Sequence, residues 1–116
     1  MSSSARLLIA GTRWRLFGSS GAADTLLDAM DGDDEQQRMI AGMSLVKAGQ
    51  RSLDLIERKI EAGAATAPVI RLLPDIGGER ARSLLESVAD SASADLRKEA
   101  HECIDLLDRI EELDEA

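Results

Sequence analysis

The chain has 116 residues, 44% of them apolar, and a formal charge of −8. This length and composition fit one folded domain and exclude a disordered chain. The acidic balance argues against nucleic-acid binding, which needs a basic stripe, and no run approaches the roughly 20 apolar residues of a membrane-spanning helix. One Trp, one Phe and no Tyr leave the core to aliphatic side chains, which favours helices over sheet.

Residues 1–21 form an N-terminal segment that is both basic and apolar. Residues 1–23 contain three arginines and no acid, so this stretch carries +3 and the rest of the chain carries −11. A helix is predicted over 5–17, and the glycines and serines of 18–21 end it. Two interpretations stay open. The segment is either the first, capping helix of a helical stack or an exposed amphipathic helix that touches a membrane surface or a partner.

Six further helices are predicted from the spacing of apolar side chains at the helical period. They form two alternating kinds, here called second helices (22–31, 50–61 and 79–90) and first helices (36–48, 66–77 and 95–112). Gly49 follows one first helix, where a left-handed cap is favourable. Pro74 is expected to kink or shorten the helix over 66–77. Ser93 or Asp95 can cap the last helix, and residues 113–116 are predicted to be an acidic, fraying tail.

The second helices repeat one pattern every 29 residues. Two apolar residues and an acid recur as Leu26-Leu27-Asp28, Leu55-Ile56-Glu57 and Leu84-Leu85-Glu86. A small residue precedes each block by three positions: Ala23, Ser52 and Ala81. Arg51 and Arg80 keep the same spacing, as do Gly49 and Gly78. This period indicates a repeat array, in which neighbouring helical pairs cover one another's apolar faces.

The first helices carry residues that resemble a known family. Short HEAT-like repeats of the phycobilisome-lyase type have a similar pattern to Arg38, Ala41, Leu45 and Gly49, and again to Leu96, Arg97, Ala100 and Ile104. Asp31 to Arg38 and Asp90 to Arg97 share a seven-residue spacing, whereas Ile60 and Ala67 replace that pair at the middle junction. The resemblance implies an all-α fold over residues 22–112, a right-handed α-α superhelix (solenoid) of about three to three and a half helical hairpins. For function it implies a protein-binding surface rather than one particular activity.

The polar faces of the second helices line the inner, concave wall of HEAT-like stacks. The resemblance therefore implies a partner-binding surface made of Asp28, Arg51, Asp54, Glu57, Arg58, Arg80, Ser83 and Glu86. Its mixed charge suits a protein segment better than nucleic acid. A plain solvated face explains the same pattern equally well, so both interpretations stay open. The Asp–Arg pairs at the repeat junctions are interpreted as structural, with Asp in the turn and Arg bridging neighbouring repeats.

Residues with chemical reactivity are few. His101 and Cys103 are two apart on a predicted helix, so they do not share a face, and a zinc site needs three or four ligands. Cys103 is expected to pack as a small apolar residue, and a single cysteine excludes an internal disulfide. No glycine motif of a phosphate-binding loop follows a strand. We therefore predict no catalytic residue, no metal site and no cofactor.

The repeat and the missing chemistry favour a non-enzymatic protein-interaction or scaffold module in the cytoplasm. The resemblance also leaves an alternative, a lyase-like or chaperone-like protein that acts on a small molecule such as a bilin, so enzymatic activity stays an open question. The expected partner is another protein, with no nucleic acid and no membrane insertion. A homodimer through helix 95–112 would cover the apolar row that this helix cannot bury on one neighbour, namely Leu96, Ala100, Cys103, Ile104, Leu107 and Ile110.

Overall fold

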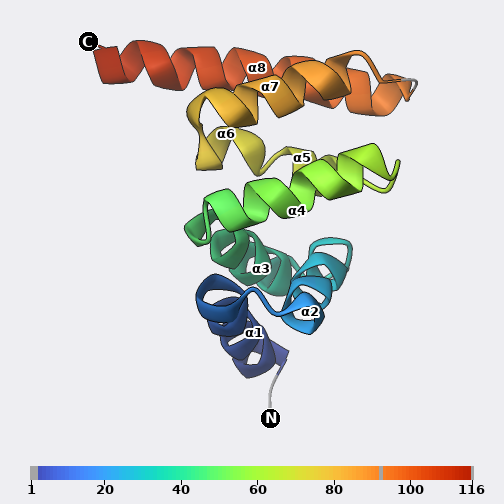
Figure 1. Cartoon of the computed structure of the whole chain (residues 1–116), viewed down its shortest axis with the longest axis vertical. Coiled ribbons are helices and arrows are strands. Elements are labelled where there is room, and N and C mark those ends of the chain that lie inside the picture. The colour runs from blue at the N-terminus through green and yellow to red at the C-terminus, as the bar shows by residue number, and fades with distance from the viewer. Residues whose placement is uncertain (1–2, 92, 116) are drawn as a thin grey trace. The chain divides into compact units, whose positions relative to one another are not determined.

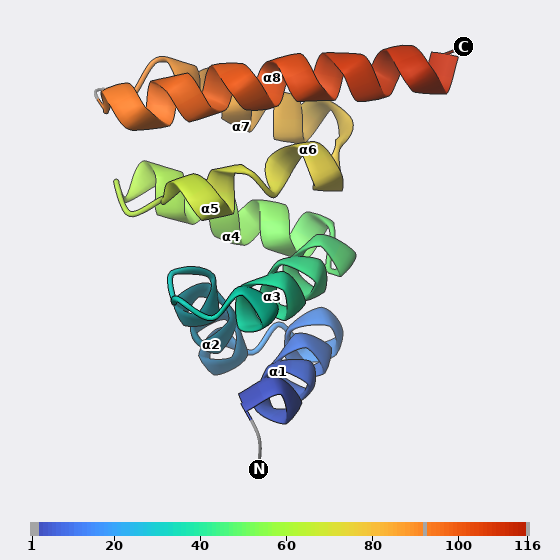
Figure 2. The same cartoon turned by 180° about the vertical axis from the view of Figure 1, so that it is seen from behind.

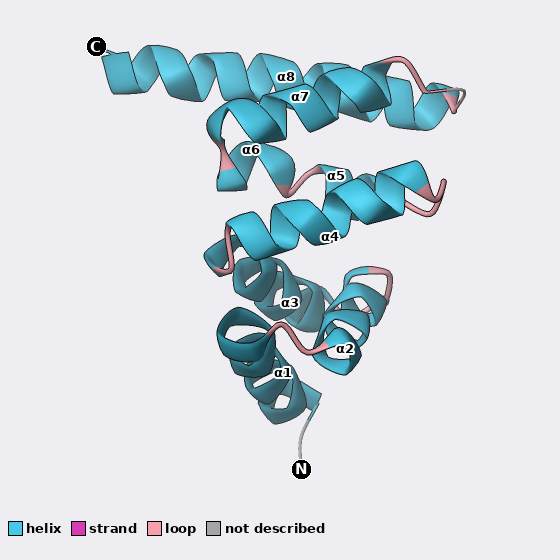
Figure 3. Ribbon diagram, viewed as in Figure 1, coloured by secondary structure: helices cyan, strands magenta, loops and turns pink. Residues whose placement is uncertain are grey.

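The protein is described by a computed structural model, which places residues 3–91 and 93–115. Within these ranges every regular element is a helix, and short loops join the helices (Figure 3). The elements are α1 (Ser3–Phe17), α2 (Ser20–Met30), α3 (Glu35–Lys47), α4 (Gln50–Glu61), α5 (Ala67–Ile70), α6 (Leu73–Ile76), α7 (Gly78–Ala89) and α8 (Ala94–Glu115). The all-α prediction is therefore confirmed. The finer prediction of a right-handed solenoid stays a prediction.

Two compact units divide the chain, Met1–Asp54 and Leu55–Ala116, and the boundary falls inside α4. In the first unit α1 packs on both α2 and α3, and α2 packs on α3 (Figure 1). Leu7, Ala10 and Trp14 form the buried side of α1. The predicted helix of the basic N-terminal segment is therefore an integral part of this unit.

The second unit is built around α8, which packs along α7 and also contacts α5 and α6 (Figure 2). Its most buried side chains are aliphatic and come from all of these helices: Ile70, Leu73, Leu85 and Leu107. The helix predicted over 66–77 is divided into α5 and α6, and Pro74 lies in the first turn of α6. Proline cannot donate a backbone hydrogen bond, so it fits the first turn of a helix but interrupts a helix that already runs through its position. The prediction that Pro74 shortens this helix is confirmed.

The 29-residue period corresponds to equivalent buried positions on α2, α4 and α7. Each leucine that begins the repeated block is buried: Leu26, Leu55 and Leu84. The small residue three positions earlier is buried as well, with at most 2% of its surface exposed in Ala23, Ser52 and Ala81. The sequence pattern thus marks the face by which each of these helices enters a core.

The loops between helices are fixed by repeated local contacts. Arg38 donates to the carbonyl of Gly32 at 2.6 Å, and Arg97 donates to the carbonyl of Ser91 at 2.8 Å. Both bonds reach six residues back, so both arginines brace the turn that precedes their own helix. The bridging of neighbouring repeats predicted for these arginines stays a prediction, because both of these bonds run to the local turn. Among the predicted caps of α8, Ser93 accepts the amide of Leu96.

The last helix is longer than predicted. α8 continues to Glu115, so residues 113–115, predicted as a fraying tail, are helical. Arg82 on α7 lies 2.7 Å from Asp108 and 2.7 Å from Glu111. This pairing reduces the repulsion that acids experience near the negative end of the helix dipole.

Candidate functional site

The structure distributes the predicted partner-binding residues over the two units. Asp28, Arg51 and Asp54 belong to the first unit, and the other five belong to the second. Six of the eight side chains are exposed, whereas Glu57 and Arg80 are half-buried. The predicted binding surface that would join the two groups stays a prediction, and each group is described by itself.

The two arginines of the repeat make different contacts within their units. Arg80 donates to Glu57 at 3.3 Å and so joins α7 to α4. Arg51 lies over the ring of Trp14, 5.9 Å from its centroid, where a cation–π attraction is favourable. The Arg51 guanidinium also packs against Gly18, at the turn between α1 and α2. Both predicted binding residues therefore have a structural role.

A buried polar chain, which the sequence interpretation missed, lies beneath Arg51. The indole Nε1 of Trp14 donates to Oγ of Ser52 at 3.0 Å, and this hydroxyl in turn donates to the carbonyl of Leu45. Trp14 is 3% exposed and Ser52 is fully buried. These two hydrogen bonds tie α1, α3 and the start of α4 together. The sequence does contain a signal for these hydrogen bonds: Ser52 stands at a repeat position where the other two repeats have alanine, Ala23 and Ala81.

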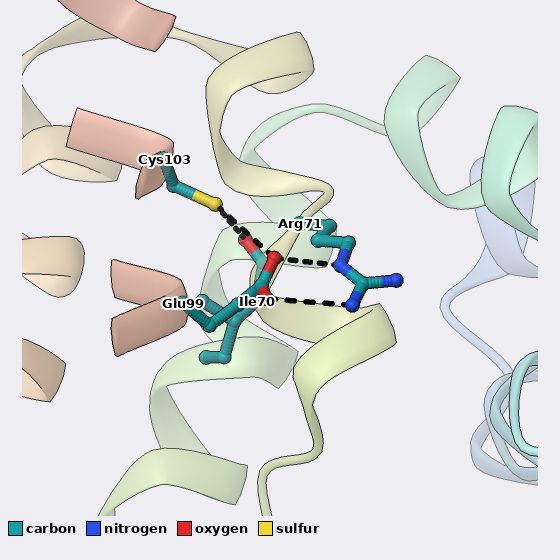
Figure 4. A network of polar contacts seen from close by, with 4 residues as sticks. All are labelled: Ile70, Arg71, Glu99 and Cys103. Carbon is teal, nitrogen blue, oxygen red and sulfur yellow. Dashed lines mark hydrogen bonds and ion pairs between the residues drawn. The ribbon is translucent and has the colours of Figure 1, made fainter. Parts of the chain in front are cut away.

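Cys103, Glu99 and Arg71 form a polar cluster in the second unit (Figure 4). Nε of Arg71 donates to Glu99 Oε1 at 2.6 Å, a hydrogen bond that raises the pKa of the guanidinium. Sγ of Cys103 lies 3.9 Å from the carbonyl oxygen of Ile70 and 3.9 Å from Glu99 Oε1. Burial raises the pKa of the Cys103 thiol to about 11, so almost none of it is thiolate at neutral pH. Since the thiolate is the nucleophile, this cluster lacks an activated cysteine.

Metal chemistry finds no support in the described part of the chain. No group of three or more His, Cys, Asp or Glu residues there is placed to hold a metal ion. His101 is exposed. No helix in residues 3–91 and 93–115 has the length and apolar character needed to cross a bilayer.

The exposed apolar side chains of α1 are the most unusual surface feature of the first unit. Leu8 is 60% exposed, Leu16 is 57% exposed and Phe17 is 76% exposed, and Ile9 is also exposed. At about 100° per residue, Ile9 and Leu16 lie opposite the buried side that carries Trp14, Leu8 lies about 120° from Trp14, and Phe17, at the end of the helix, lies about 60° from it. We call these four residues the α1 apolar face. A helix that is apolar on two sides usually buries both, and here only one side is covered.

Arginines border the α1 apolar face. Arg6 and Arg13 line a cavity of about 440 Å³ between α1 and α2, together with Ile9, Ser19, Ala22 and Thr25. Arg15 lies on the other side of the face. The three guanidinium groups have no carboxylate of the described residues within ion-pair distance. The surface therefore combines apolar area with positive charge that is free to meet an acidic partner.

Comparisons with known proteins give no relative from which the function of this surface could be inferred. No protein-family model, no curated protein and no solved structure matches the chain. The resemblance to HEAT-like repeats therefore stays a prediction.

Proposed function

We propose that this chain is a non-enzymatic protein-binding module and that the α1 apolar face is its binding surface. The observation that carries the proposal is the second, uncovered apolar side of α1. Exposed clusters of large apolar residues rimmed by polar ones are typical of interaction sites. The raised pKa of the Cys103 thiol and the structural contacts of the repeat arginines support a role without chemistry.

The charge around the surface indicates what kind of protein segment would bind. Residues 1–23 carry +3, and Arg6 and Arg13 line a cavity that also contains the hydroxyl groups of Ser19 and Thr25. Opposite charge across an interface selects the partner and speeds association. The expected partner segment is therefore an amphipathic helix with leucine-like anchors and flanking Asp or Glu.

Selection from a displayed library of random 16-residue peptides tests the proposal. The wild-type chain, at dilute concentration, should enrich acidic peptides with apolar anchors. Replacing Leu16 and Phe17 by serine should abolish their binding, since both side chains are exposed and contribute contact area without supporting the core. The control is Leu113→Ser, which removes an equally exposed apolar side chain from α8. Peptides that bind the wild type and the Leu16/Phe17 variant equally well would refute the assignment to this surface.

A further inference from the structure

The α1 wall of the cavity between α1 and α2 consists of two arginines with apolar residues between them. Arg6 and Arg13 are seven residues apart, which is about two helical turns, so they lie on one side of α1 and about 10 Å apart along its axis. Ile9 and Ala10 lie between them, each about one turn from either arginine. The cavity, of about 440 Å³, therefore presents two positive charges at a fixed spacing with apolar area between them.

The α2 wall of the same cavity adds positive potential. It comes from the start of α2, which is the positive end of the helix dipole, and the first turn of α2 contains no acid. Its two hydroxyl groups already make local hydrogen bonds. Thr25 donates to the carbonyl of Gly21, and Ser19 accepts the amide of Ala22. The eight described residues that line the cavity are thus two arginines and six uncharged residues, and the arginines are the groups suited to bind an anion.

An acidic partner helix that runs along α1 can meet both arginines in one register only. Two acids seven residues apart on the partner share one side of it and lie about 10 Å apart, which equals the spacing of Arg6 and Arg13. A residue three or four positions after the first acid then faces the cavity between the arginines. A large apolar side chain there would cover Ile9 and Ala10, and a volume of about 440 Å³ has room for it.

We infer that this cavity selects its partner by the spacing of the partner's side chains: an acid, a large apolar residue three or four positions later, and a second acid seven positions after the first. The inference rests on the proposed function, because it specifies the partner helix of the same surface. Ile9 belongs both to the α1 apolar face and to the cavity, and all of these residues lie in the unit Met1–Asp54. The apolar face supplies contact area, and the arginine pair supplies selection, since charges across an interface fix its register.

Fluorescence anisotropy with two 16-residue helical peptides of identical composition tests the inference. Both carry leucine anchors, but one has its two glutamates seven residues apart and the other has them five apart, which places them about 140° apart around the helix. The wild type should bind the seven-residue spacing about fivefold more tightly or better, because only this peptide forms both exposed ion pairs. The variant with Arg6→Glu and Arg13→Glu should bind that peptide about tenfold more weakly and should prefer the peptide with lysine at both acid positions.

Arg15→Glu is the matched control for the charge change. Arg15 is an exposed arginine on the same helix, about 180° around α1 from Arg6, so it lies away from the cavity. This variant should keep the preference for the seven-residue spacing.

A second pair of variants tests the cavity itself. Gly21 lines the cavity, and its backbone is not left-handed, so α2 can accept a larger residue there. Gly21→Leu would fill part of the cavity and should weaken binding of the seven-residue peptide by about tenfold, because it displaces the apolar anchor. Gly21→Ala adds only one methyl group and should keep the affinity within about twofold. Circular dichroism checks that every variant keeps its helices.

Three results would overturn the inference. The wild type could bind both peptides equally, the Arg6/Arg13 variant could keep the preference, or Arg15→Glu could lose it, which would attribute the preference to net charge. If acidic peptides bind and are lost with Leu16 and Phe17 but show no preferred spacing, the proposed function stands and only the register is wrong. If no peptide binds, and the chain binds vesicles of phosphatidylserine and phosphatidylcholine but not of phosphatidylcholine alone, both proposals are wrong and the α1 apolar face belongs to an anionic membrane.

Discussion

Replacing Ser52 by alanine should destabilise the first unit by about 1–2 kcal/mol. The change leaves the indole N–H of Trp14 without its acceptor in a site that is 3% exposed, and an unsatisfied buried donor costs about 1–3 kcal/mol. The carbonyl of Leu45 keeps a bond from the amide of Ala48 at 3.2 Å, so it adds little. Alanine regains about 0.5 kcal/mol through its higher helix propensity.

Urea unfolding followed by tryptophan fluorescence measures this effect, because Trp14 is the one tryptophan of the chain and lies beside the substitution. With a slope of about 1–3 kcal/mol per molar urea for a small protein, the midpoint should fall by roughly 1 M. Ser83→Ala is the matched control, since Ser83 is an exposed serine within α7. It gains the same helix propensity and loses no buried hydrogen bond, so its midpoint should stay level or rise slightly.

A double-mutant cycle with Trp14→Phe decides whether the indole hydrogen bond is the cause. Phenylalanine has no hydrogen-bond donor, so Ser52→Ala should lower the free energy of unfolding clearly less in that background. Because this background lacks the tryptophan, unfolding is followed by circular dichroism. An equal cost in both backgrounds would show that the indole bond contributes nothing and that the reasoning from the buried chain is wrong.

Two further predictions concern packing and reactivity. Gly11→Ala should destabilise the first unit by about 1–3 kcal/mol in the urea assay, because the new Cβ would lie 2.5 Å from Oγ and 2.8 Å from Cβ of Ser44 across the contact of α1 with α3. Gly21→Ala, in the first turn of α2, would place its Cβ in ordinary contact with Oγ of Ser19 at 3.9 Å and should stabilise the unit by about 0.5–1 kcal/mol, so a loss at both sites would contradict the steric argument. Cys103 should react with a thiol reagent at pH 8 at least about a hundredfold more slowly in the native chain than in urea, since its pKa is raised to about 11. Because the fold favours the neutral thiol, its contribution to stability is complete below the unfolded pKa of about 8.5 and is lost as the pH rises through about 11. Equal reaction rates in the two states would refute the assignment of Cys103 to the core.

The helices could be predicted from the sequence because local signals agree along most of the chain. Apolar spacing, Gly49 and Pro74 located the element ends to within about two residues in most cases, and α4 matches its prediction at both ends. The end of α8 was missed because the neutralising partner, Arg82, comes from another helix. A macrodipole argument applied to one helix cannot include a charge that only the tertiary structure brings close.

The candidate surface was harder to predict, because exposure depends on which helix covers which. The apolar residues of α1 were recognised, but the sequence does not say that Leu7 is buried and that its neighbour Leu8 is exposed. Both sides of α1 are apolar, so the spacing alone cannot choose between them. The contacts of Arg51 with Trp14 and of Ser52 with Leu45 likewise join residues that local reasoning cannot pair.

The buried positions recur in each repeat of this chain, whereas the polar contacts of the repeat residues differ from one repeat to the next. Glu57 and Arg80 form an ion pair at a separation of 23 residues, and Asp28 and Arg51 stand at the same separation in the preceding repeat. Arg51 nevertheless lies over Trp14, because α1 supplies an aromatic ring at that place, and the Ser52 hydroxyl is matched to that ring's N–H. The apolar period therefore specifies that α2, α4 and α7 enter a core, while the particular neighbour of each helix decides its polar contacts. By the same logic, the exposed apolar side chains of α1 are where a partner has the most to contribute.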